Sequence, residues 1–157
     1  MTEAALDGLF EGLTAAGSGA ISLADVLGMK RQVLDVLLDK AIGLANFGKL
    51  EQAENELDRL HQVDGRSPLP AFALGAVRAE RKNFEGALEA YREAERRAEA
   101  LAWSAMVGKV ALCLGHAHLA LGERAEAELA LARAEARGEP AVQETARAML
   151  RAIEGST

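Results

Sequence analysis

The sequence predicts an all-α protein, a solenoid of paired helices, on three observations. Alanine supplies much of the half of the residues that are hydrophobic, and it is the strongest helix former. Only three prolines interrupt 157 residues, and residues typical of strands are sparse. A motif also repeats at the period of a helix pair. We therefore expect one domain over 1–157, divided into an N-terminal helix and hinge (1–21), three helix pairs (22–136) and a capping helix (137–157).

The first segment carries an apolar stripe at the spacing of one helix face, formed by Leu6, Leu9, Phe10 and Leu13. A short amphipathic helix is expected here, followed by a flexible hinge over the small residues 14–20. The helical pattern restarts at Ser22 and continues to Phe47, with a break or kink expected at Gly28. Gly48 is well placed to end that helix in a left-handed conformation.

The chain then repeats itself. The stretch AIGLANFGKLEQAENELDRL, from Ala41, aligns with GAVRAERKNFEGALEAYREA, from Gly75. Ala53 and Ala87 lie 34 residues apart, the length of one helix–turn–helix unit. Small residues at these positions let the two helices of a unit approach closely. We expect both alanines to be buried, and a large apolar residue four positions later to fill the contact with the next unit.

A third copy, GHAHLALGERAEAELALARA, begins at Gly115, and its alanine Ala127 follows Ala87 by 40 residues. The six extra residues lie between 96 and 109, where no proline or turn cluster occurs, so longer helices are expected there. Pro140 then suits the first turn of a final helix, whose single apolar stripe predicts a terminal cap for the stack.

The repeat pattern resembles the tetratricopeptide repeat family over roughly residues 34–136. The middle copy carries the consensus residues Leu74, Gly75, Phe84, Ala87, Tyr91 and Ala94. The resemblance implies a right-handed α-solenoid of three such helix pairs. The sequence departs from the family at three points. The first copy lacks the consensus aromatic near its start, Lys40 stands where leucine is usual, and Arg124 stands where an aromatic residue usually closes the turn.

The order of a short helix, a glycine-rich hinge, three repeats and a final helix is also similar to a narrower family. These are the class II chaperones of bacterial type III secretion, which hold translocator proteins before export. The matching residues are Gly48, Lys49, Ala53, Leu74, Gly75, Ala87 and Tyr91. The six-residue expansion before the third repeat does not match. This resemblance implies a protein client and a homodimer formed through the N-terminal helix.

Solenoids of this kind bind partners on the concave surface lined by the first helix of each pair. By helical position, ten residues are expected to form a mainly apolar groove there: Leu38, Ile42, Asn46, Leu69, Phe72, Ala76, Ala79, Leu112, His116 and Leu119. With Glu80 as a further polar point, the groove suits an extended peptide with spaced apolar anchors. The other interpretation makes some of these residues ordinary core between repeats.

The charge of the chain limits the classes of partner, and its cysteine content limits the possible disulfides. The net charge is −6, from 24 acidic and 18 basic residues, and no basic stripe occurs, so we expect neither nucleic-acid binding nor attraction to anionic membranes. No signal peptide and no apolar run of about 20 residues is seen, which predicts a cytoplasmic protein without membrane insertion. The single cysteine, Cys113, excludes an internal disulfide.

Catalysis is not expected, because no phosphate loop, metal-ligand spacing or nucleophile constellation occurs. We predict no cofactor and no metal site: His116 and His118, two positions apart, fall on different faces of a helix. Cys113 and Trp103 are expected in packed core, and the acidic run at 51–60 on a solvated face with local ion pairs.

Two functions therefore remain open. The first is a chaperone that holds an extended apolar segment of a secreted protein in the groove. The second is a structural adaptor or assembly subunit that docks on a larger complex through its N-terminal helix. Deleting residues 1–20 separates them, since a groove would still bind its peptide whereas a docking subunit would lose its partner.

Overall fold

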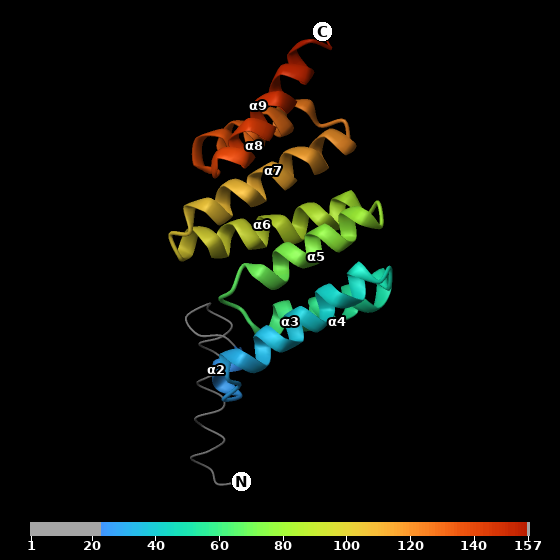
Figure 1. The fold of residues 1–157 in the computed structure, drawn as a ribbon, viewed down its shortest axis with the longest axis vertical. Coiled ribbons are helices and arrows are strands. Elements are labelled where there is room, and N and C mark those ends of the chain that lie inside the picture. Colours follow the sequence, from blue (N-terminus) through green and yellow to red (C-terminus); the bar gives the residue numbers. More distant parts are fainter. Residues whose placement is uncertain (1–22, 157) are drawn as a thin grey trace.

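The structure is a computed structural model that describes residues 23–156, so the expected N-terminal helix and hinge at 1–21 lie outside the described residues. Within this range the chain is helical and contains no strand. The elements are α2 (Leu23–Val26), α3 (Arg31–Asn46), α4 (Leu50–Val63), α5 (Leu69–Glu80), α6 (Phe84–Ala100), α7 (Ser104–Ala120), α8 (Arg124–Arg137) and α9 (Pro140–Glu154). They stack in chain order along the long axis, with α2 and α9 at opposite ends (Figure 1).

Glycines end two of the helices as the sequence predicts. Gly28 has a φ of 66° and separates α2 from α3, and Gly48 has a φ of 75° directly after α3. The N–H of Lys49 then donates to the carbonyl of Leu44 at 2.9 Å, which closes the α3 terminus in a Schellman-type arrangement. The break expected at Gly28 and the left-handed conformation expected at Gly48 are therefore confirmed. Helix α3 turns sharply into α4.

Successive helices pack as pairs, α3 with α4, α5 with α6 and α7 with α8, each joined by a short turn. The first helices of the pairs also contact one another, α3 with α5, α5 with α7 and α7 with α9. In the described part of the chain the second helices α4, α6 and α8 make no such contacts. In a curved stack, the helices that approach one another more closely lie on the inside. Helices α3, α5 and α7 therefore form the inner row.

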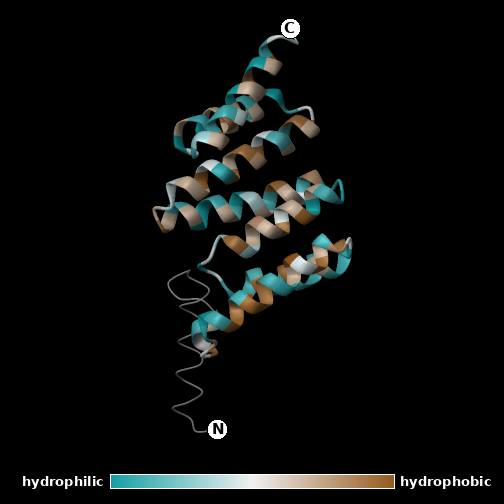
Figure 2. Ribbon diagram, viewed as in Figure 1, coloured by the Kyte–Doolittle hydropathy of each residue, from teal (hydrophilic) through white to brown (hydrophobic). Residues whose placement is uncertain are grey.

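The predicted small residues lie in the core. Ala53, Ala87 and Ala127 are each 0% exposed, as the repeat requires. A Cβ on Gly75 would lie 2.5 Å from the Tyr91 ring, which therefore packs directly on the glycine backbone of its own pair. Figure 2 shows that α5 and α7 carry mostly apolar residues, whereas α6 is largely hydrophilic on the face in view.

The six-residue expansion lengthens two helices, as predicted: α6 and α7 have 17 residues each. The turn between them contains Ala102 with a φ of 51°. Trp103 is 43% exposed beside this turn, so the prediction that it packs in the core was wrong. A turn between two helices lies at the edge of the stack, where no third helix covers it.

Pro140 occupies the first turn of α9, as predicted. The expected apolar stripe packs on α7 and α8 through Val142, Ala146, Met149, Leu150 and Ile153. Helix α9 therefore closes this end of the apolar core and presents its polar side outward.

Candidate functional site

A mainly apolar hollow of about 510 Å³ lies between α3 and α5, the first two helices of the inner row. Its floor includes Leu57 from α4, which is fully buried. The lining residues are Leu38, Asp39, Ile42, Ala45, Asn46, Leu57, Leu69, Phe72, Ala73, Ala76, Val77 and Glu80. Small alanines on both helices leave space that larger side chains would fill.

Six of the ten predicted groove residues come together in this hollow: Leu38, Ile42, Asn46, Leu69, Phe72 and Ala76. Their spacing along α3 and α5 explains why, since residues three, four, seven or eight positions apart share one helix face. They differ in accessibility, because Leu38 is only 6% exposed whereas Ile42 is 38% exposed. Leu38 thus serves as core as well as lining, and Ile42 can contact a guest.

The other four predicted residues lie elsewhere. Ala79 packs partly buried against the core shared by α5, α6 and α7. Leu112 and Leu119 pack on the cluster that joins α7, α8 and α9. His116 is exposed on α7. These four do not line the hollow between α3 and α5, because Ala79 packs toward α6 and α7 and the other three lie on α7, further along the stack.

Phe72 is held in place by the consensus residues of its own repeat. The centroids of the Phe72 and Tyr91 rings are 5.9 Å apart with a tilt of 44°. Tyr91 in turn packs on Gly75, where no side chain intervenes. Tilted aromatic pairs at this separation are favourable, so this wall of the hollow is preformed.

The charged groups of the hollow are all acidic. Asp39 on α3 and Glu80 on α5 line it, and no lysine, arginine or histidine does. The arginines near the end of α5 face the other way: Arg78 Nε lies 3.1 Å from Glu54 Oε1 on α4, and Arg81, the residue after α5, pairs with the same carboxylate. These contacts also correct the prediction that the acidic run of α4 makes only local ion pairs.

The linker between α4 and α5 is fixed by Arg97 of α6, which is only 6% exposed. Its guanidinium donates to the carbonyls of Asp64 at 2.9 Å, Ser67 at 3.2 Å and His61 at 3.2 Å. Its Nε lies 2.6 Å from Glu93 Oε1. Because this linker connects the first pair to the second, Arg97 helps to set the spacing of α3 and α5.

Asp64 and Glu93 complete this polar cluster. The buried Asp64 carboxylate accepts from Arg31 at 2.7 Å and from the Ser67 N–H at 3.3 Å. Hydrogen bonds from Arg96 and then Arg97 lower the pKa of Glu93 to about 2, against the opposing effect of burial. Carboxylates and guanidiniums thus brace the linker at its two ends.

Asp39 and Arg97 are among the residues that sequence reasoning missed. Asp39 shares a face with Ile42 and Asn46, at three and seven positions, which is a usable signal. Arg97 interrupts the apolar stripe of α6, three positions after Ala94, and a charge in such a stripe marks a buried partner. Nothing in the sequence indicates that its partners are main-chain carbonyls.

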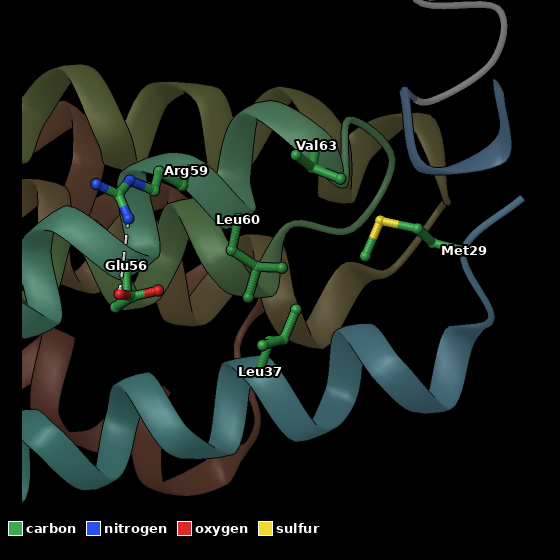
Figure 3. A pocket seen from close by; sticks show the side chains of 6 residues that line it. All are labelled: Met29, Leu37, Glu56, Arg59, Leu60 and Val63. Carbon is green, nitrogen blue, oxygen red and sulfur yellow. Dashed lines mark ion pairs between the residues drawn. The ribbon is translucent and has the colours of Figure 1, made fainter. Parts of the chain in front are cut away.

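A second, smaller hollow of about 100 Å³ lies at the other side of α3 (Figure 3). Leu37, next to Leu38, faces it together with Met29 and, from α4, Leu60 and Val63. An ion pair between Arg59 and Glu56, at 3.8 Å, borders it, as the dashed line in Figure 3 marks. Adjacent residues of α3 therefore face two different hollows.

The residues considered for chemistry are Cys113, His116 and His118. Burial raises the pKa of the half-buried Cys113 thiol, which keeps it protonated. His118 is buried, and its Nδ1 lies 2.5 Å from Glu123 Oε2, while His116 faces solvent, so the two imidazoles do diverge. No group of three metal-ligating side chains occurs within residues 23–156.

None of the helices from α2 to α9 has the length and apolar content that crossing a membrane requires.

Comparison with known proteins gives a fold and no sequence family. No protein-family model and no curated protein matches the chain. Among solved structures, a type III secretion system complex from Aeromonas hydrophila has a TM-score of 0.80 at 19% identity, covering 92% of this chain and 95% of that one. The translocator chaperone SycD of Yersinia enterocolitica has a TM-score of 0.74 at 22% identity, covering 84% and 98%.

A third similar structure is PcrH in complex with the chaperone-binding region of PopD. It has a TM-score of 0.72 at 23% identity, covering 82% of this chain and 96% of that one. At these identities the likeness concerns the backbone alone. The chain therefore has the helical-repeat fold seen in type III secretion translocator chaperones.

Proposed function

We propose that the chain is a non-catalytic chaperone that holds an extended apolar segment of a type III translocator protein in the hollow between α3 and α5. The observation that carries this proposal is the hollow itself, which is apolar, preformed and placed on the inner row. Burial of apolar client side chains would supply the affinity, at roughly 25 cal/mol per Å² removed from water.

The geometry suits an extended segment. In an extended chain alternate side chains point to the same side, so two anchors can enter a single hollow. Ile42 and Phe72 offer accessible apolar contacts on opposite helices, and Ala76 leaves room between them. Because Tyr91 already fixes Phe72, binding requires little ordering of this wall.

The structural neighbours support the same assignment. SycD is a translocator chaperone, and PcrH has been solved with the chaperone-binding regions of PopD and PopB. A crystal structure of SycD has also been solved as an alternative dimer. By this likeness we extend the proposal to a cytoplasmic protein that forms a homodimer through its N-terminal region.

Substitution of Ala76 by arginine tests the proposal. The exposed Ala76 side chain lines the hollow, so Ala76→Arg should fill it and place a cation among apolar groups. The full-length chain is co-expressed with each translocator protein of its host, and the co-purified complex is quantified. We expect the native protein to retain a translocator and Ala76→Arg to lose at least about tenfold of it, which corresponds to about 1.4 kcal/mol.

The matched control is Ala132→Arg, since Ala132 is an exposed alanine on α8, outside the hollow. It should leave the complex unchanged, and circular dichroism should show that both variants fold. Equal retention by the native protein and by Ala76→Arg would place the client elsewhere and contradict the proposal.

A further inference from the structure

The hollow between α3 and α5 combines an apolar lining with charge of one sign. Asp39 projects from α3 and Glu80 from α5, so the two carboxylates come from the two helices that flank the space. Both side chains are exposed, and within residues 23–156 neither makes an ion pair with a basic side chain. The rim therefore carries two acidic groups without a counter-charge from the described chain.

The arrangement of α5 explains this segregation. Glu80 shares the face of Phe72 and Ala76, at intervals of four residues, and so points to the hollow. Arg78 and Arg81 lie on the face turned toward α4, where both bind Glu54. Arg78 also donates to the carbonyl of Gly86 at 3.1 Å, which holds it there. Arg78 and Arg81 are thus already occupied and do not neutralise Glu80.

We infer that the hollow selects client segments in which a lysine or arginine flanks the apolar anchors; this rests on the proposed function. The long aliphatic stem of such a residue can lie along the apolar wall while its charged end reaches Asp39 or Glu80. A client aspartate or glutamate at the same place would be repelled, and the net charge of −6 adds to that repulsion.

The preference for a basic flanking residue should be modest, because both carboxylates are exposed. Surface ion pairs contribute little individually, so two of them should favour a basic over a neutral flank by about three- to tenfold in affinity. The preference should weaken as salt is added, since screening acts on exposed charges. Apolar burial would provide the remaining affinity and would be insensitive to salt.

The test uses short fluorescein-labelled peptides of equal length, in which two leucines are separated by one serine. They differ only in the residue on each side of the leucines, which is lysine, glutamine or glutamate. Affinity for the full chain is measured by fluorescence anisotropy at low and high salt. We expect the lysine peptide to bind most tightly, the glutamate peptide most weakly, and the difference to shrink at high salt.

Two variants locate the effect. The double variant Asp39→Asn/Glu80→Gln should bind the three peptides about equally. Glu89→Gln removes one negative charge from an exposed position on α6, away from the hollow, and should keep the native ranking. Because all three replaced side chains are exposed, the variants should fold as the native chain does.

The outcomes distinguish this inference from the proposed function. Equal binding of all three peptides to the native protein overturns the charge preference and leaves the apolar groove in place. A lysine preference that survives in the double variant overturns the assignment to Asp39 and Glu80. Binding of none of the peptides overturns the groove itself, and the preference with it.

Discussion

Single residues decide how closely the helices of each pair approach. Gly75 and Gly115 lie where α5 meets α6 and where α7 meets α8. The space of their missing side chains is taken by the Tyr91 ring and by the Leu131 side chain, respectively. Interiors are packed densely, so neither neighbour can move without opening a void or a clash elsewhere.

Gly75→Ala should therefore destabilise the protein, although alanine is the better helix former. The new Cβ would lie 2.5 Å from the Tyr91 ring, and such overpacking costs about 1–3 kcal/mol. Gly43→Ala is the matched control, because a Cβ at Gly43 in α3 meets nothing within 4 Å. It should stabilise by about 0.5–1 kcal/mol. Urea unfolding measures both, and two changes of the same sign would refute the packing argument.

The stability that Glu93 contributes should depend on pH. Its pKa falls from 4.5 to about 2 in the folded state, chiefly through the hydrogen bond from Arg96. The unfolded chain thus binds a proton more readily, so the stability from this group is complete above about pH 5 and is lost as pH falls toward 2.

Glu93→Gln should accordingly lower the free energy of unfolding near neutral pH, and the gap from the native protein should narrow toward pH 2. Urea unfolding across this range measures it, with Glu89→Gln, exposed on the same helix, as the control. A gap that stays constant with pH would show that the Glu93 charge contributes nothing.

The sequence predicted individual residues well where one local rule decides them. The burial of Ala53, Ala87 and Ala127 follows from the repeat, because each position recurs at a helix crossing. Trp103 could not be placed the same way, since its exposure depends on where the α6–α7 turn falls in the lengthened junction. The burial of His118 was not predicted, and its Nδ1 lies 2.5 Å from Glu123, beyond the end of its own helix.

At the scale of elements, the linker between α4 and α5 joins two helix pairs through polar contacts. Its carbonyls would lie buried without partners if Arg97 were absent, and unpaired buried polar groups are costly. The helix ends at Gly48 and Pro140 were predictable from capping chemistry. The bracing by Arg97 was not, because it joins α6 to a segment about 30 residues earlier through main-chain atoms.

Arg97→Met should destabilise the protein by about 2–4 kcal/mol, since it removes a buried charge partner and three carbonyl bonds. Hydrogen exchange should accelerate first in residues 61–69. Arg92→Met, at an exposed position of the same helix, should have little effect on either measurement. If both variants unfold at the same urea concentration, the linker does not depend on Arg97.

At the scale of the whole molecule, helices α2 to α9 form a linear stack in which each helix contacts mainly its neighbours along the chain. Such stacks lose structure locally, because within residues 23–156 no contacts join the first pair to the last. The hollow lies between α3 and α5, near one end, and α9 covers the other end (Figure 1). Damage at α9 should therefore leave the hollow largely unaffected.

Ala146→Glu tests this independence. Ala146 is 0% exposed against α7 and α8, and a carboxyl placed there without a partner costs about 1–3 kcal/mol. Hydrogen exchange should accelerate in α8 and α9 and remain unchanged in α3 to α5. Uniform acceleration along the chain would instead mean that the stack unfolds as one cooperative unit.

The hydrogen bonds from Arg97 to main-chain oxygens have a consequence for sequence variation. Every amino acid supplies the same carbonyl, so mutations that recode His61, Gly65 or Arg66 would leave the acceptors in place as long as the loop keeps its path. Relatives of this chain could thus diverge at those three positions while inheriting one arginine. A search for them should weigh the arginine on α6 more heavily than the loop it holds.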